Sequence, residues 1–310
     1  MKKIVTLLSL AVLGLVLTAC SSNEGKNKAN DKLQVVTTFY PMYDFTKNIV
    51  GDKADVSMLI TGGTEPHDYE PSAKDIARIQ DADVFVYNSN EMETWVESVL
   101  ANIDKKKTKV IEASDAIELM EGSESEEGEE AEHGHEHGLD PHVWLDPVLV
   151  KKEVAAISDG IIEVDEKNKA TYEENTKNYQ GQLSELDKTF KEAFKTAKNR
   201  EFVTQHAAFG YLAKQYDLKQ VSISGISPDQ EPSPSELAKI EDFVKKNKVD
   251  YIYTEELASS KIAETIANAT GAKMIDLNTL EGLSKDKQES GSDYISEMKE
   301  NVKALQKTIK

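Results

Sequence analysis

The sequence has almost no cysteine, no block of positive charge and no apolar run long enough to cross a bilayer. Cys20 is the only cysteine among 310 residues, which excludes a disulfide within the chain. Lys and Arg number 37 against 56 Asp and Glu, which gives a net charge of −19. Because such a chain repels phosphate groups, we expect no nucleic acid partner and predict that cations are its natural ligands.

The N-terminal segment has the features of a secretory signal. The charged start MKK precedes an apolar run over residues 4–19, which is short for a transmembrane helix. The sequence LTAC, which ends at Cys20, resembles the lipobox of bacterial lipoproteins. This resemblance implies a signal peptide over 1–19, a lipid on Cys20 and a flexible tether over 20–31. We therefore expect an extracytoplasmic protein anchored to the cell membrane, of the Gram-positive cell-surface type; a free buried thiol at Cys20 is the alternative.

The remaining chain predicts an α/β protein with two lobes, each a mostly parallel sheet covered by helices. Short β-branched runs alternate with helical patterns, which is typical of this class, and 39% apolar residues in a chain of this length can fill two cores. Strands are predicted at 33–39, 55–60, 83–88, 109–111, 201–205, 219–223, 250–255 and 272–277. Helices are predicted at 42–50, 72–81, 92–103, 147–164, 167–197, 209–216, 234–247, 259–269 and 292–308.

A long linker helix is predicted over 166–198. Its large apolar residues recur every three, four or seven positions and so share one face: Tyr172, Tyr179, Leu183, Leu186, Phe190, Phe194 and Ala197. Such a helix would be a rigid strut between an N-terminal lobe at 32–165 and a C-terminal lobe at 199–310. Gly181 costs about 1 kcal/mol relative to Ala in a helix and argues against an unbroken one.

Residues 113–140 lack apolar periodicity and exceed the usual connection of about 4 to 6 residues, so we predict a disordered, acidic, histidine-rich surface insertion. It contains His133, His135 and His137. Holding them in one geometry would cost about 1 to 2 kcal/mol of backbone entropy per residue, which leaves only weak, exchangeable metal capture. Collection of metal ions near a binding site and a plain solvated linker both stay open as hypotheses.

Three other histidines lie where a fold would control them. His67 follows the strand predicted at 55–60, His142 begins a helix between two Asp-Pro pairs, and His206 follows the strand at 201–205. Ligands of open α/β sheets bind beyond the carboxyl ends of the strands, so we expect these imidazoles to meet between the lobes. A packed or solvated histidine without a metal is the alternative at each position.

Three imidazoles leave one position of a tetrahedron open, and an anionic oxygen from the second lobe would complete it. Glu281 lies in the loop after the strand at 272–277, whereas its competitor Asp276 is still within the strand pattern. We therefore prefer Glu281. Imidazole ligands suit Zn2+, while Mn2+ prefers a larger share of oxygen.

These segments together resemble a known family. The signal with its lipobox, the PHDYEP loop, the histidine-rich insertion before DPHVWLDP, TQHAAFGY and LNTLEGL are similar to the zinc-binding solute-binding lipoproteins of ABC transporters, the ZnuA- and AdcA-like proteins of the cluster A-I family. The resemblance covers residues 33–310. It implies two α/β lobes joined by a long rigid helix, with Zn2+ held in the cleft between them by His67, His142, His206 and Glu281. Some relatives carry an additional C-terminal zinc-binding domain, which we expect to be absent because the sequence stops just after a helix.

The same resemblance implies a carrier and not an enzyme. We expect a monomer that binds zinc tightly and delivers it to an ABC permease driven by a cytoplasmic ATPase. One alternative is a zinc-dependent hydrolase in which three histidines hold an activated water, although the chain has neither HExxH nor GxSxG. The other is a manganese-binding solute-binding protein or an adhesin with a role in cell adhesion.

Overall fold

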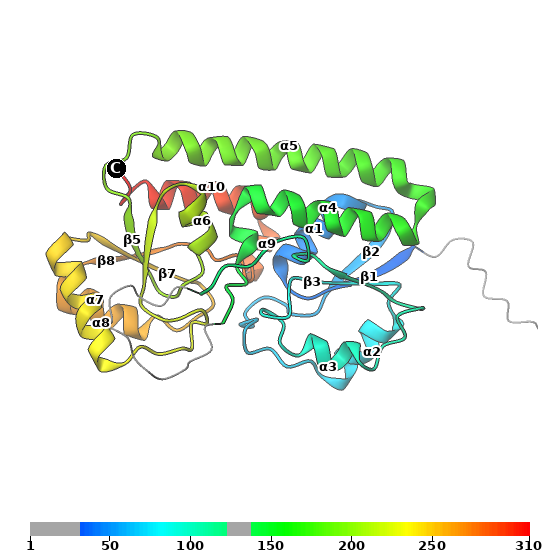
Figure 1. Ribbon diagram of the computed structural model, residues 1–310, viewed down its shortest axis with the longest axis horizontal. Coiled ribbons are helices and arrows are strands. Elements are labelled where there is room, and N and C mark those ends of the chain that lie inside the picture. Colours follow the sequence, from blue (N-terminus) through cyan, green and yellow to red (C-terminus); the bar gives the residue numbers. More distant parts are fainter. Residues whose placement is uncertain (1–31, 123–137) are drawn as a thin grey trace, which may run out of the picture. The chain divides into compact units, whose positions relative to one another are not determined.

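Two parallel sheets of four strands form the framework of a computed structural model that describes residues 32–122 and 138–310 (Figure 1). Residues 33–310 form one compact unit that contains both sheets. The predictions for the signal peptide, the tether, Cys20 and the trio His133, His135 and His137 lie outside the described residues. Among the helices that are described, none combines the length and apolarity needed to cross a bilayer.

The two sheets share one topology. The first contains β1 (Leu33–Thr37), β2 (Ala54–Met58), β3 (Val84–Tyr87) and β4 (Lys109–Glu112), in the order β2-β1-β3-β4. The second contains β5 (Glu201–Thr204), β6 (Lys219–Ser222), β7 (Tyr251–Thr254) and β8 (Lys273–Asp276), in the order β6-β5-β7-β8. All pairings are parallel. The predicted fold class is therefore confirmed, and each lobe presents its ligand-binding loops at the carboxyl ends of its strands.

Helices cover the sheets and connect the lobes. They are α1 (Tyr40–Val50), α2 (Ala73–Asp81), α3 (Val96–Leu100), α4 (Pro147–Val164), α5 (Lys169–Phe194), α6 (Gly210–Gln215), α7 (Pro234–Asn247), α8 (Lys261–Thr270), α9 (Lys285–Glu289) and α10 (Tyr294–Leu305), with 3-10 turns at Val143–Leu145 and Glu166–Asn168. Local chemistry fixes several starts: Ser233 forms a capping box with Glu236 before α7, and Pro234 occupies the first turn.

The helix predicted at 92–103 is shorter than expected. The buried carboxylate of Glu93 accepts hydrogen bonds from the backbone N–H groups of Asn88 and Ser89 and from the hydroxyl of Thr38. These bonds hold a turn after β3, so α3 begins only at Val96. The apolar pattern alone could not reveal this competing use of a polar side chain.

The long helix α5 is continuous through Gly181 and spans about 39 Å at 1.5 Å per residue. Gly181 is exposed, and its lack of a side chain therefore removes no core contact. Six of the seven predicted apolar positions are buried along α5, which packs against α1, α4 and α10. In Figure 1 this helix runs over both lobes. One apolar cluster continues from the first lobe through α5 into the second, so α5 packs against the cores of both lobes and connects them rigidly.

The range predicted for the disordered insertion, 113–140, is too wide, because the residues at both of its ends are ordered. Ala113 and Ile117 are buried, and the backbone N–H of Met120 donates to the hydroxyl of Tyr211 in α6. Glu121 forms an isolated bridge with Leu139. Contacts with a distant part of the chain order these flanks, and the local sequence does not reveal such contacts.

Candidate metal centre

His67 reaches the centre from the loop between β2 and α2. The loop leaves the sheet in an ordered way, because the N–H groups of Leu59 and Ile60 donate to the carbonyls of Thr37 and Thr38 at the end of β1. The backbone N–H of His67 then donates to the carboxylate of Glu65, 3.2 Å away. Pro66 and Pro71 restrict the backbone on either side of the histidine.

His142 is held through both its backbone and its ring. It precedes the 3-10 turn Val143–Leu145, and both its backbone N–H and its ring Nδ1 bond to Asp140 Oδ1, at 2.9 and 2.7 Å. The second lobe holds Asp140 in turn, because the hydroxyl of Tyr211 donates to the Asp140 carbonyl at 2.7 Å. Gly210 allows this approach, since a Cβ there would lie 2.8 Å from Asp140 Oδ2.

His206 lies two residues beyond β5, as predicted. Its carbonyl accepts hydrogen bonds from the hydroxyl of Thr204 and the amide of Gln220, at 2.7 and 2.9 Å. Its ring Nδ1 lies 2.6 Å from Glu255 Oε1. Glu255 directly follows β7, the strand paired with β5, so the two side chains meet at the carboxyl edge of neighbouring strands.

Glu281 enters from the loop after β8. The preceding Leu280 adopts a left-handed backbone with φ of 59°, and its N–H donates to the side chain of Asn278. A contact from the first lobe fixes the same loop, because the indole N–H of Trp144 donates to the carbonyl of Thr279 at 2.8 Å. Asp276 remains an exposed residue of β8, so the structure brings Glu281 and not Asp276 to the histidines.

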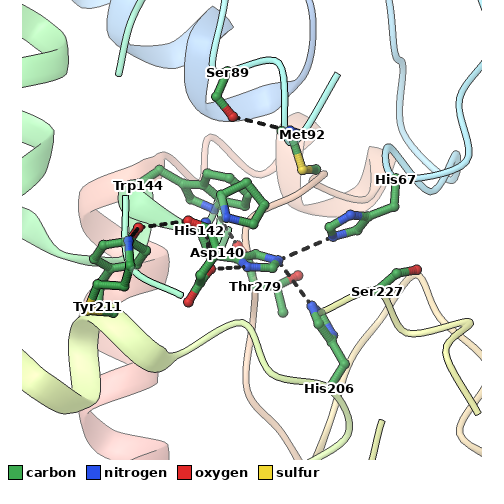
Figure 2. A network of polar contacts seen from close by, with 12 residues as sticks. His67, Ser89, Met92, Asp140, His142, Trp144, His206, Tyr211, Ser227 and Thr279 are labelled. Atoms are coloured by element: carbon green, nitrogen blue, oxygen red, sulfur yellow. Dashed lines mark hydrogen bonds and ion pairs between the residues drawn. The ribbon is translucent and has the colours of Figure 1, made fainter. Parts of the chain in front are cut away.

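The four candidate ligand atoms lie within 4.8 Å of one another, and five of their six separations are close to the edges of a tetrahedral zinc site. His142 Nε2 lies 3.2 Å from His67 Nε2 and 3.3 Å from His206 Nε2, and Figure 2 shows its ring between the other two. Glu281 Oε1 lies 3.3 to 3.5 Å from all three nitrogens. Four atoms placed about 2.0 to 2.1 Å from a common centre would be about 3.3 to 3.4 Å apart, so the cluster has the dimensions that Zn2+ needs.

Burial makes this convergence costly unless a cation compensates for it. Glu281 is 1% exposed, and no group donates a hydrogen bond of normal geometry to either of its oxygens. The Nε2 atoms of His67 and His206 both face that of His142, and all three face this carboxylate. A buried carboxylate without a hydrogen-bond partner of normal geometry, faced by three imidazole nitrogens, is the expected appearance of a cation site.

The pKa shifts show how protons compete for the same atoms. Burial lowers the pKa of His67, and Glu281 offsets this only in part. Burial also acts to lower the pKa values of His142 and His206. Asp140 together with Glu281 outweighs this effect at His142, and Glu255 together with Glu281 outweighs it at His206, so both pKa values are raised. Burial acts to raise the pKa of Glu281, but the charge of His206 and contacts with all three imidazoles hold it well below its usual value. A cation that binds here must therefore displace a proton.

Three residues that support the centre were not predicted from the sequence. Asp140 could have been noticed, since it lies two residues before His142. Glu255 required the strand order, because only the pairing of β5 with β7 places it beside His206. Tyr211 required the contact between lobes, which no local pattern encodes.

Residues 35–308 match the family described as zinc-uptake complex component A, periplasmic. The chain is 52% identical to the high-affinity zinc uptake system protein ZnuA of Bacillus subtilis, over 99% of this chain and 98% of that protein. It is 50% identical to the zinc-binding lipoprotein AdcA of Streptococcus pneumoniae R6, over 99% of this chain but only 61% of that longer protein. The crystal structure of the Zn(II)-bound ZnuA-like domain of AdcA from S. pneumoniae is similar, with a TM-score of 0.77 and 48% identity over 90% of this chain and 99% of that one.

Proposed function

Because this chain belongs to the family of zinc-uptake complex component A, we propose that it is an extracytoplasmic solute-binding protein that binds Zn2+ and delivers it for uptake. Two relatives, one named for zinc uptake and one for zinc binding, match 99% of the chain at 52% and 50% sequence identity. The family is a carrier component and not an enzyme family. Zinc is therefore the cargo of this site.

We assign the binding of one Zn2+ to His67, His142, His206 and Glu281. The observation that carries this assignment is that five of the six separations among their ligand atoms are 3.2 to 3.5 Å, close to the edges of a zinc tetrahedron, and that all four atoms lie within 4.8 Å of one another. Three imidazoles and one carboxylate also suit Zn2+ better than Mn2+, which prefers more oxygen ligands. The manganese alternative is for this reason not favoured.

The hydrolase alternative is not favoured either. A catalytic zinc site keeps one position open for water, whereas Glu281 supplies a fourth protein ligand here. Glu281 is buried against all three imidazoles, where it occupies the position that a reactive water would need. A closed coordination sphere suits storage and transfer of the ion.

The partners and the anchor extend this proposal. A component of a zinc-uptake complex passes its ion to a membrane permease, and we propose an ABC permease with its ATPase as the partner of a monomer. Lipidation at Cys20 would keep the protein at the membrane, and the name of one relative, a zinc-binding lipoprotein, supports it.

We also propose weak zinc capture by His133, His135 and His137. Deletion of 123–137 tests it: zinc uptake at limiting zinc should fall, and unchanged uptake would leave only the role of a plain linker.

Metal analysis of purified protein tests the proposed function. After exposure to equimolar Zn2+ and Mn2+ and removal of free metal, we expect wild type to retain one zinc per chain by mass spectrometry. His142→Ala should retain far less, because it removes the imidazole that contacts all three other ligand atoms. Equal zinc in both proteins would refute the site, and a preference for manganese would refute the proposed cargo.

A further inference from the structure

Glu255 holds the ring of His206 on the side opposite to the metal centre. Its Oε1 lies 2.6 Å from His206 Nδ1, whereas Nε2 of the same ring lies 3.3 Å from both His142 Nε2 and Glu281 Oε1. The Glu255 side chain is 4% exposed and that of His206 is fully buried. An ionised carboxylate only accepts hydrogen bonds, so Nδ1 must be the donor in this pair, and Nε2 is the nitrogen available to a metal.

Hydrogen bonds fix the backbone of both Glu255 and His206. The side chain of Gln205 accepts from the backbone N–H of Glu255 at 3.4 Å and donates to the carbonyl of Ser259 at 3.1 Å. The His206 carbonyl receives two hydrogen bonds of its own. The backbone of each partner is therefore fixed, which sets where the two side chains start.

We propose that Glu255 is a positioning residue for zinc, which orients the His206 ring so that Nε2 faces the ion and makes that nitrogen a stronger ligand. A carboxylate that accepts from the distal nitrogen of a metal-bound imidazole increases the basicity of the ring, and loss of such a partner typically weakens metal binding about 10- to 100-fold. The inference rests on the proposed function, because it assumes that His206 binds Zn2+.

Glu255 is a cleaner position for a test than Asp140. Asp140 bonds to both the ring and the backbone N–H of His142, and its own backbone bonds to Met120 and Tyr211, so its replacement would disturb the local fold. Glu255 uses one oxygen for His206, and its other oxygen is buried without a hydrogen-bond partner in the described structure. Its side chain thus has a single visible role.

The experiment compares Glu255→Ala and Glu255→Gln with the neighbouring control Glu256→Gln. Glu256 pairs with Lys287 at 3.3 Å and does not contact the metal centre. Zinc dissociation constants are measured by chelator competition, and thermal unfolding of the metal-free proteins reports on the fold. We expect Glu255→Ala to weaken binding at least tenfold, Glu255→Gln about threefold because its amide oxygen still accepts from Nδ1, and the control less than twofold.

A spectroscopic readout separates positioning from a general structural effect. In zinc-loaded wild type, NMR should show a slowly exchanging, downfield Nδ1–H proton of His206, and this signal should be lost in Glu255→Ala but kept in the control. If Glu255→Ala does not fold, Glu255→Gln carries the same test through its threefold loss. Unchanged affinity in the Glu255 variants, or an equal loss in the control, would overturn the inference, whereas wild type that binds no zinc would overturn the proposed function itself.

Discussion

Two glutamates, Glu281 in the metal centre and Glu153 inside the first lobe, are both buried without a hydrogen-bond partner, yet their environments give them opposite character. Burial acts to raise both pKa values. At Glu281 the positive charge of His206 and the three imidazole contacts reverse this effect, while at Glu153 the nearby carboxyl groups of Glu93 and Asp146 add to it and raise the pKa to about 8.

The comparison shows that an unpartnered buried carboxylate does not identify a metal site by itself. What matters is the set of groups that face it. Imidazole nitrogens that can ligate a metal surround Glu281, so a metal cation completes its environment. Other carboxyl groups lie near Glu153, so a bound proton completes the environment there. Among the described residues, the metal-ligand geometry is found only at His67, His142, His206 and Glu281.

The largest expected effect is on zinc binding. Glu281→Ala removes the only anionic ligand and should weaken binding about 100-fold, or about 2.7 kcal/mol. Glu153→Gln should leave the zinc affinity within twofold of wild type, because Glu153 lies in α4 and belongs to no ligand cluster. Isothermal titration of both variants checks this difference, and a large loss in Glu153→Gln would break the distinction between the two sites.

Glu153→Gln should instead change how stability depends on pH. The folded-state pKa of Glu153, about 8, lies above its ordinary value of 4.5, so its stabilising contribution is complete below pH 4.5 and is lost as the pH rises towards 8. Gln carries no such proton. The free energy of unfolding of the variant relative to wild type should therefore increase with pH in this window, by up to about 1.4 kcal/mol per pH unit.

Urea unfolding of the metal-free proteins at pH 5.5, 6.5 and 7.5 measures this dependence. Glu93 and Asp146 also have raised pKa values, but they are present in both proteins, so most of their effect cancels in the difference. Asp159→Asn, on the exposed side of α4, is the matched control for a substitution in the same helix. If the difference in unfolding free energy between Glu153→Gln and wild type is constant with pH, the pKa of Glu153 is not raised in the folded protein.

Trp144 connects the ligand His142 to the Glu281 loop, and its loss should have a smaller effect. Trp144→Phe keeps most of the packing against Phe39 but removes the hydrogen bond to the Thr279 carbonyl. Leaving that buried carbonyl unpaired should cost about 1 to 2 kcal/mol of unfolding free energy. Zinc binding should weaken a few-fold because the Glu281 loop loses its restraint, and wild-type values for both quantities would argue that the indole N–H does not hold the loop.

The smallest effect is expected at Tyr294, which lies between the two regions. Its hydroxyl donates to the Trp144 carbonyl at 2.7 Å, and burial followed by the charge of Glu153 raises its pKa. Tyr294→Phe should cost about 1 kcal/mol of unfolding free energy and leave zinc affinity within twofold of wild type. A zinc loss as large as that of Trp144→Phe would instead make Tyr294 part of the support for the Glu281 loop.

The order of elements and the four ligand candidates could be predicted from the sequence because they depend on local signals. Apolar periodicity marks the strands, positions just after strand ends mark His67 and His206, and the two Asp-Pro pairs at the start of a helix mark His142. Glu255, Tyr211 and the packed flanks of the 113–140 segment could not be predicted, since each depends on which strands pair or which lobe faces which loop. Glu153 was missed for another reason: its burial follows from the packing of α4, while its residue type suggests an exposed position.

X-ray absorption spectroscopy of the zinc-loaded protein tests the central claim most directly. The account predicts four light-atom ligands at about 2.0 Å, with the multiple-scattering pattern of three imidazoles and no exchangeable water in the first shell. A zinc ion with fewer than three imidazoles, or with a bound water in place of the Glu281 carboxylate, would contradict it.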